Sequence, residues 1–203
     1  IAAEDHDHEE VEWAGILSEA STLEKVTSPI GNCDRTPVGW LRFGPSIEAA
    51  IEDCFRFLPP SEFRNEVRTL IEDTYRVGVS PVDAYARMMG RLFEDFGLIL
   101  ADPLDEGLRS MAKDVLGTLG RRVGDVRTAL LARGRLIAAA GYAEQVRVDD
   151  SFTGLFAFRG RARETLTTGE EIASLDLSPN VLLRPLVQDS LFPTAAYVGG
   201  PAE

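Results

Sequence analysis

The amphipathic pattern through the middle of the chain constrains its fold more than any other feature. Across Ser61–Arg76, apolar side chains recur every three or four residues, the spacing of one helix face, and Gly78 ends the pattern. Ser80 and Pro81 then have the residue types of a helix cap and a first helical residue. The side chains that this second helix is expected to bury are Tyr85, Met88, Met89, Leu92 and Phe93. Gly97 marks its end, so the middle of the chain is predicted to be mainly helical.

Short apolar runs predict β-strands around the later helices. We interpret Leu98–Ala101 as a buried parallel strand, with Asp102 and Pro103 capping the helix after it. Val146–Val148 and Leu155–Phe158 are expected to form a hairpin or a sheet edge. Strands that alternate with helices are typical of an α/β fold.

This order of elements predicts three segments. Residues 45–140 form a largely helical insertion, which ends with a helix from about Arg121 to Ala140. Residues 1–44 and 141–203 are expected to belong to one core with parallel strands. The prediction is therefore an α/β fold whose sheet is interrupted by the insertion.

A polar face on an otherwise apolar helix is the clearest sign of a binding site. Ser178 and Pro179 are predicted to cap and begin this helix. Asn180, Arg184 and Gln188 then follow at four-residue spacing and would line one face. Buried polar groups need partners, so these three side chains either pair inside the protein or bind a ligand.

Two interpretations of Arg184 stay open. Its guanidinium either forms a buried ion pair with Asp189 beside a kink at Pro185, or holds a substrate carboxylate through two parallel hydrogen bonds. The strand expected after this helix leads to Gly199 and Gly200, where a backbone can approach a ligand closely.

Acidic and histidine side chains gather at residues 4–10, EDHDHEE. In an extended segment, His6 and His8 would share one side, as the ligands of a metal must. Alternatively, Asp5, His6 and Asp7 orient an amine or act as a general base and its partner. Asp7 could also cap a turn that begins near His8. The sequence leaves these interpretations open.

Charge and composition exclude several classes of protein. The chain has 203 residues, and 21 Lys and Arg against 33 Asp and Glu give a net charge of −12. Such an acidic chain lacks the basic surface that nucleic acids or anionic membranes require, and no apolar run approaches the roughly 18 residues that span a bilayer. Cys33 and Cys54 stand far apart and are interpreted as reduced thiols, so we expect a cytoplasmic protein.

Two long motifs and several short ones match a known family. The long ones are SPNVLLRPLVQDSLFPTAAYVGGPAE at residues 178–203 and the acidic signature within IAAEDHDHEEV at residues 1–11. The short ones are PVG at 37–39, YARMMGRLFEDFGLILADP at 85–103, GYAEQV at 141–146 and TGLFAF at 153–158. Over its whole length the chain resembles the cysteine ligases of bacillithiol biosynthesis, the BshC family.

The resemblance implies both a fold and an activity. The fold would be a Rossmann-like parallel sheet core with a helical connective segment. The activity would be the last step of bacillithiol biosynthesis, in which an amide bond joins cysteine to glucosaminyl-malate. Activating the cysteine carboxylate normally requires ATP or another nucleotide, with Mg²⁺. The sequence has no P-loop and no complete dinucleotide motif, so the cosubstrate stays open.

The resemblance also implies a longer protein, since family chains are more than twice this length. A first Rossmann strand would precede Ile1, and a long coiled coil that makes a homodimer would follow Glu203. The chain would then be truncated at both ends. A fragment of this kind could fold and still be catalytically incomplete.

The hypothesis assigns a role to each candidate residue. The residues expected to bind or deprotonate the sugar amine are Asp5, His6 and Asp7. Asn180, Arg184 and Gln188 are expected to hold the malyl carboxylates or the activated acyl group. At Gly199 and Gly200, backbone amides would approach an anion. A metal-dependent hydrolase built on EDHDHE is the alternative function.

Overall fold

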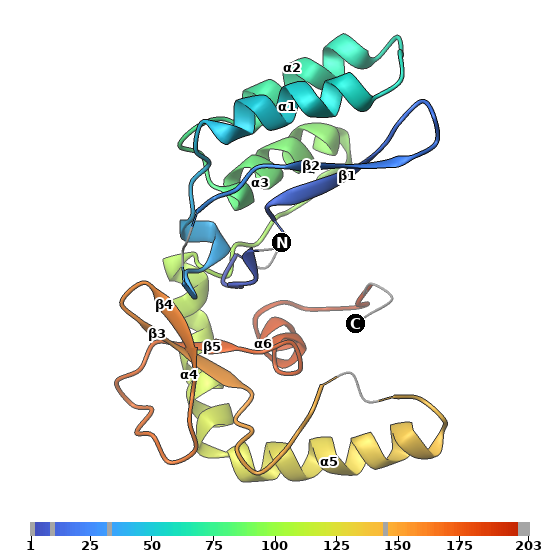
Figure 1. Cartoon of the computed structure of the whole chain (residues 1–203). Helices are drawn as coiled ribbons and strands as arrows, with labels where there is room; N and C mark the ends of the chain where they lie inside the picture. The colour runs from blue at the N-terminus through green and yellow to red at the C-terminus, as the bar shows by residue number, and fades with distance from the viewer. Residues whose placement is uncertain (1–2, 9–10, 32–33, 144–145, 199–203) are drawn as a thin grey trace. The chain divides into compact units, whose positions relative to one another are not determined.

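The chain divides into two compact units, Ile1–Leu104 and Asp105–Glu203 (Figure 1). The computed structural model describes residues 3–8, 11–31, 34–143 and 146–198. Both units combine helices with a small sheet, as an α/β protein requires.

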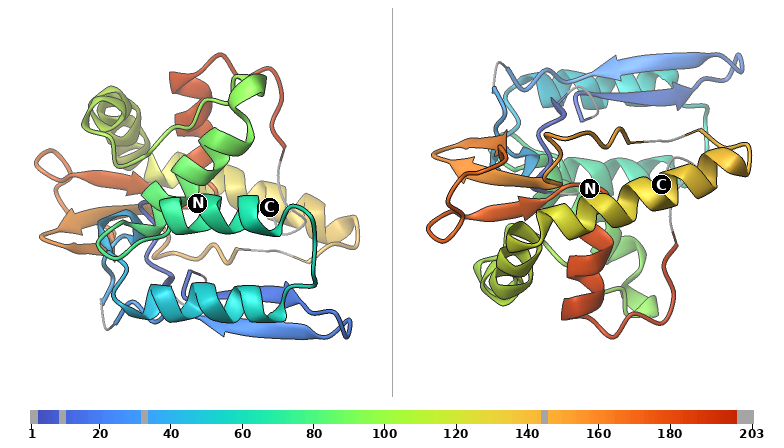
Figure 2. Two further views of the ribbon diagram at one scale, coloured as in Figure 1. Left: turned by 90° about the horizontal axis from the view of Figure 1, so that it is seen from above. Right: turned by 90° about the horizontal axis from the view of Figure 1, so that it is seen from below.

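A two-stranded hairpin lies near the start of the first unit. β1, Trp13–Leu17, pairs antiparallel with β2, Leu23–Thr27. Figure 2 shows the hairpin alongside α1, Ser46–Phe57, and both strands contact that helix. Val26 is the buried residue of β2, so one face of the hairpin covers the helices and the other is open to solvent.

Short helical elements make up the rest of the first unit. They are η2 (Val38–Trp40), α1 (Ser46–Phe57), α2 (Arg64–Thr74), α3 (Pro81–Leu92) and η3 (Glu94–Phe96). The Ser80 hydroxyl accepts a hydrogen bond from the backbone N–H of Asp83 at 2.9 Å, which confirms the predicted cap of α3.

The core of the first unit is built on one face of α1. Ile47, Ile51 and Phe55 recur every four residues, so they share a face, and all three are buried. They pack with Phe43 and Ala84. The apolar face of α1 is therefore the surface on which this core is built.

The segment after α3 differs from the prediction. Leu98–Ala101 is not a strand, and Ile99 is 90% exposed. Gly97, with a φ of 65°, turns the chain out of the preceding helical turn, and none of the described strands pairs with this run. The next helix begins later than predicted because Asp105 caps it, whereas Asp102 accepts the backbone N–H of Leu104 within a turn.

The second unit combines three helices with a three-stranded sheet. Its elements are α4 (Glu106–Arg121), α5 (Val123–Ala139), β3 (Leu155–Arg159), β4 (Ala162–Thr165), β5 (Leu177–Pro179) and α6 (Arg184–Leu191). The predicted helix from Arg121 to Ala140 is confirmed as α5.

The central strand of this sheet is β3. The strand order is β4-β3-β5, and α4 packs against both β5 and α6. Leu155 and Ala157 of β3 alternate toward the core, where they meet Leu116 of α4 and two residues of α6 or its cap, Leu183 and Val187. The sheet and the two helices thus enclose one apolar core.

The hairpin partner of β3 also differs from the prediction. Val146–Val148 is not a strand, and β3 pairs instead with β4 across the two-residue turn Gly160–Arg161. Gly160 has a φ of 61°, which suits a tight hairpin turn. A turn this short joins antiparallel strands only.

The predicted parallel pairing is not found between the described strands, since all three strand pairs are antiparallel. β5 returns to β3 through a loop without a helix, and a parallel return would need a longer crossover. The helices α1 to α5 nevertheless fall within the predicted insertion, residues 45–140. The division into segments 1–44, 45–140 and 141–203 stays a prediction.

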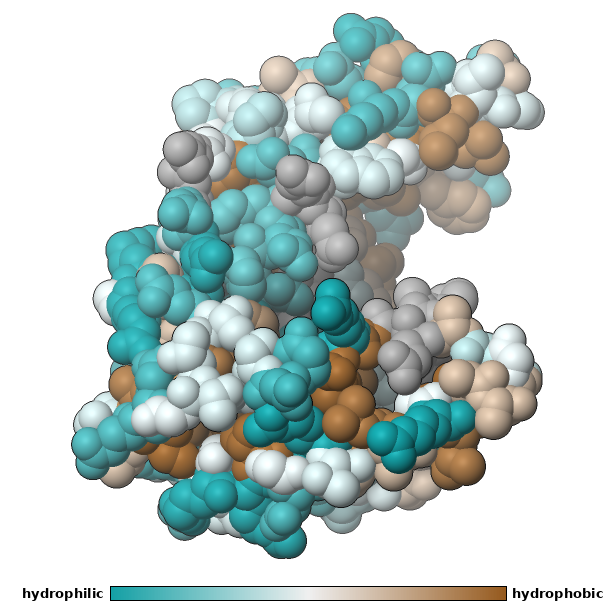
Figure 3. Space-filling view, turned by 60° about the horizontal axis from the view of Figure 1, so that its bottom comes forward, coloured by the Kyte–Doolittle hydropathy of each residue, from teal (hydrophilic) through white to brown (hydrophobic). Residues whose placement is uncertain are grey.

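Apolar side chains also reach the surface of both units. On the face displayed in Figure 3, brown apolar residues lie among teal polar ones. Exposed large apolar side chains include Phe96 and Ile99 in the first unit and Leu136 and Leu186 in the second. None of the described helices is both long and apolar enough to cross a membrane.

Candidate functional site

The acidic loop near the start of the chain is held by the segment that follows the hairpin. The backbone N–H of Val38 donates to the carbonyl of Asp5 at 2.7 Å, and that of Gly39 donates to the carbonyl of Ala3 at 2.8 Å. These bonds fix the backbone on which Asp5 and His6 stand. Two of the predicted motifs, EDHD and PVG, are therefore directly bonded to each other.

Gly39 is what allows this close approach. A Cβ at this position would lie 2.7 Å from Cδ1 of Leu104 and 3.2 Å from the carbonyl oxygen of Ala3. Distances this short force atoms to move. The glycine of PVG therefore has a packing role under the acidic loop.

Asp5 and His6 form the polar centre of the loop. The Asp5 carboxylate accepts the backbone N–H of His6 at 2.8 Å, and its Oδ1 lies 4.0 Å from Nδ1 of His6. The side chains are 38% and 24% exposed, so both can meet a ligand while keeping fixed positions. Asp7 is exposed, and Glu4, only 2% exposed, lies beneath the loop.

The described residues do not place His8 together with His6 in a metal site. The Nε2–H of His8 donates to the Thr36 carbonyl across 2.8 Å, which occupies that ring nitrogen. In the described part of the chain, no group of three or more His, Cys, Asp or Glu side chains could hold a metal ion. The metal interpretation of residues 4–10 thus lacks a supporting geometry among these residues.

The predicted helix start at Ser178 and Pro179 is wrong. Both residues belong to β5 and pair with β3, and the helix begins at Arg184. Asn180 lies in the turn between them, where its Oδ1 accepts the backbone N–H groups of Leu182 and Leu183, each at 3.1 Å. Asn180 therefore does not share a helix face with Arg184, because its side chain shapes the entry into α6.

The other two polar residues keep the predicted arrangement. Arg184 and Gln188 are four residues apart within α6, so they share a face, and both are half-buried. They lie beside the row formed by Leu183 and Val187, which packs into the core. Pro185 sits in the first turn of α6, where proline fits a helix, so the predicted kink is not required.

Gly154 positions the turn before α6. Its φ is 70°, and a Cβ there would lie 2.7 Å from Cδ1 of Leu183. The Gly154 carbonyl also accepts the backbone N–H of Asn180 at 2.9 Å. The TGLFAF and SPNVLL motifs therefore meet at this glycine.

Arg163 is a polar residue that sequence reasoning missed. It is 2% exposed, its Nε–H donates to the Ser178 hydroxyl at 2.9 Å, and its Nη2 donates to the Pro179 carbonyl at 2.8 Å. The guanidinium also lies 3.8 Å from the centroid of the Phe156 ring. Arg163 thus ties β4 to β5 directly before the Asn180 turn. The alternation of β4, with Arg163 at an inward position, is the signal that could have found it.

The candidate residues fall into two groups, one in each unit. Asp5, His6 and Asp7 belong to the first unit, and Asn180, Arg184 and Gln188 belong to the second. Within each unit the residues are close along a single loop or turn. Gly199 and Gly200 lie outside the described residues, so the predicted approach of their backbone to a ligand stays a prediction.

Comparison with known proteins assigns the chain to a family. The model described as "Bacillithiol biosynthesis BshC, N-terminal Rossmann-like domain" matches residues 1–175 and 170–203. The chain belongs to the BshC family. This match also supports the Rossmann-like assignment of the α/β fold.

Curated relatives of the BshC family match the whole chain. Proteins from Koribacter versatilis, Salinibacter ruber and Solibacter usitatus are 33%, 32% and 31% identical to it, and each is named "Putative cysteine ligase BshC". Each alignment covers 100% of this chain and 41% of the relative. The chain thus spans about two-fifths of the length of these relatives.

Proposed function

We propose that this chain forms part of a ligase that joins cysteine to glucosaminyl-malate in the last step of bacillithiol biosynthesis. The observation that carries the proposal is the family match over the whole chain, together with the names of its relatives. The substrates are small molecules, and the enzyme acts in the cytoplasm as a homodimer.

The first-unit loop supplies the proton acceptor in this proposal. An amide bond forms when the sugar amine nitrogen attacks the activated carboxyl carbon of cysteine, and the bond from that carbon to its leaving group breaks. The proton lost by the amine passes to the His6 imidazole. Asp5 lies 4.0 Å from Nδ1 of His6 and stabilises the imidazolium, while exposed Asp7 draws the amine into the loop.

The second-unit helix supplies the binding of negative charge. Arg184 and Gln188 share a face of α6, and a guanidinium can hold a malyl carboxylate through two parallel hydrogen bonds. Asn180 contributes by setting the turn, because its side-chain oxygen already accepts two backbone N–H groups. Backbone amides at Gly199 and Gly200 would complete the anion site.

Activation of the carboxylate needs a nucleotide cosubstrate, such as ATP with Mg²⁺. It would turn a poor leaving group, hydroxide, into phosphate or a nucleotide. The sequence has no P-loop, so no residues of this chain are assigned to binding that nucleotide.

Titration of the chain with glucosaminyl-malate, followed by amide NMR, tests this proposal. We expect saturable shifts at residues 3–8 or at residues 180–191. Replacing Arg184 by Lys should weaken binding about tenfold, because an ammonium cannot reproduce the two-bond geometry. Replacing the exposed Arg135 by Lys is the matched control and should change nothing. Unaltered affinity in the Arg184→Lys variant would remove Arg184 from the site.

A further inference from the structure

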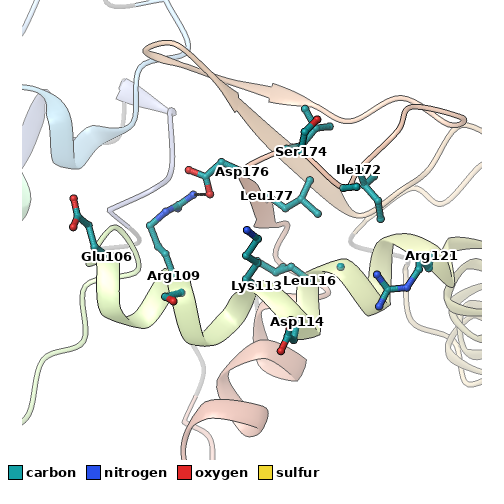
Figure 4. A pocket seen from close by; sticks show the side chains of 14 residues that line it. Glu106, Arg109, Lys113, Asp114, Leu116, Arg121, Ile172, Ser174, Asp176 and Leu177 are labelled. Atoms are coloured by element: carbon teal, nitrogen blue, oxygen red, sulfur yellow. Dashed lines mark hydrogen bonds and ion pairs between the residues drawn. The ribbon is translucent and has the colours of Figure 1, made fainter.

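A cavity in the second unit lies apart from every residue discussed above as part of the ligase site. Its volume is about 490 Å³, and it lies between α4 and residues 172–177, the segment that leads into β5 (Figure 4). This volume lies within the range of about 300–1,000 Å³ that small-molecule sites usually have.

Three cationic residues of α4 line the cavity at helical spacing. Arg109, Lys113 and Arg121 lie four and eight residues apart, so they share one face, and Gly117 occupies the position between the last two. Gly117 has no side chain, and the Arg121 guanidinium lies over it, since a Cβ at Gly117 would stand 3.3 Å from Nη1 of Arg121. Three carboxylates, those of Glu106, Asp114 and Asp176, also line the cavity, so which cations are already paired decides what it can bind.

Arg109 is already engaged within the protein. Its Nη2 forms an ion pair with Asp176, and its guanidinium lies 4.3 Å from the centroid of the Phe158 ring. The side chain is only 16% exposed. Arg109 therefore holds residues 172–177 against α4 and forms one wall of the cavity.

Lys113 has no such partner among the described residues. No carboxylate of the described residues lies within ion-pair distance of its amino group, and Figure 4 shows that group directed toward the segment carrying Leu177. Asp114 also lines the cavity, but its carboxylate is drawn on the opposite side of α4. The chain contains only one other lysine, Lys25, whose amino group lies 4.9 Å from the centroid of the Trp13 ring.

The cavity also has an apolar wall beside the Lys113 amino group. Leu116 and Leu177 are 5% and 8% exposed, and Ile172 packs against the same core. The Ser174 side chain stands across the cavity from α4 (Figure 4). A cation next to an apolar wall and a hydroxyl suits a ligand that has both a negative group and an apolar body.

We propose that this cavity binds a small organic anion. The ammonium of Lys113 holds its carboxylate or phosphate, and Leu116, Ile172 and Leu177 contact its body. The Arg121 guanidinium, which folds back toward Gly117 and donates to the Thr118 hydroxyl, lines the same cavity and can contact a second negative group. The site is separate from the residues proposed for ligation, so the test of this proposal does not depend on the ligase function.

Amide NMR of the 203-residue chain tests the site with four probes. Phenyl phosphate and benzoate each have a negative group and an apolar ring. Inorganic phosphate has only the negative charge, and phenol has only the apolar ring. We expect saturable shifts at residues 106–121 and 172–177 with phenyl phosphate or benzoate, and binding about tenfold weaker or worse with the other two probes. Whichever of the two organic anions binds more tightly shows whether the site prefers a phosphate or a carboxylate.

Two variants complete the test. Lys113→Met should weaken binding of the organic anion about tenfold, because it removes the charge while keeping the length of the side chain. Lys25→Met is the matched control and should leave binding unchanged. Unaltered binding in the Lys113→Met variant, equal binding of phenol, or the absence of shifts at these two segments with either organic anion would overturn the proposal. Because Lys113 is exposed, the variant should keep its fold, which its thermal midpoint checks.

Discussion

Arg163 links stability to the geometry of the second-unit turn. Its hydrogen bonds to Ser178 and Pro179 hold β5 in place just before Asn180. Replacing it with Met removes these bonds and leaves two buried acceptors, which we expect to cost about 3 kcal/mol of unfolding free energy. Urea denaturation measures the change, and the exposed Arg135→Met variant should alter stability by less than about 0.5 kcal/mol. A similar small effect for both variants would contradict this role.

The thiol of Cys54 gives a pH-dependent prediction. Burial raises its pKa above the usual value, and the positive charge of Arg64 offsets part of this increase. Because the folded-state pKa is the higher one, the stabilisation from Cys54 is fully present below its unfolded-state pKa and is lost as the pH rises through its folded-state pKa. In a Cys33→Ser variant, alkylation of Cys54 should therefore have its midpoint at a higher pH in the folded chain than in urea. The reverse order would contradict the burial of this thiol.

Single residues also show which local structures could be predicted from the sequence and which could not. The Ser80 cap was predictable because a hydroxyl followed by proline satisfies local backbone groups without help from the rest of the fold. Ser178 and Pro179 have the same residue types, yet they pair with β3. Their partner strand lies over twenty positions earlier in the chain, and Arg163 adds a second contact that no local pattern reveals.

At the scale of the element, two glycines in α4 have opposite roles. A Cβ at Gly120 would lie 2.6 Å from Cδ1 of Ile172, whereas one at Gly117 would meet only the flexible end of Arg121 at 3.3 Å. Gly120→Ala should therefore destabilise the protein by about 1–3 kcal/mol through overpacking. Gly117→Ala should stabilise it by about 0.5–1 kcal/mol, because alanine favours the helix. Thermal unfolding of both variants checks the signs, and equal effects would contradict this difference in packing.

The apolar run Leu98–Ala101 gives another test at this scale. Four apolar residues predicted a buried strand, but a run this short does not show whether a neighbour exists to cover it. Since Ile99 is 90% exposed, Ile99→Ser should change the unfolding free energy by less than about 0.5 kcal/mol. A loss of more than about 2 kcal/mol in urea denaturation would mean that the run is buried, as the sequence suggested.

For the whole molecule, the sequence motifs indicated which distant segments contact one another better than the hydrophobic periodicity did. The EDHD and PVG motifs are bonded to each other in the first unit, and TGLFAF meets SPNVLL at Gly154 in the second. Each pair of motifs is therefore in direct contact within its own unit. The strand topology could not be predicted in the same way, because antiparallel pairing depends on turns such as Gly160–Arg161 rather than on apolar runs.

The most direct measurement of the proposed function is product formation by a chimera. The segment of the Koribacter versatilis relative that matches this chain would be replaced by these 203 residues, and the purified chimera would be incubated with cysteine, glucosaminyl-malate and ATP with Mg²⁺. Mass spectrometry should detect bacillithiol, and His6→Ala should reduce its rate of formation by about a hundredfold, as expected for loss of a general base. A folded chimera that forms no product, beside an active unmodified relative, would contradict the assignment of ligase chemistry to this chain.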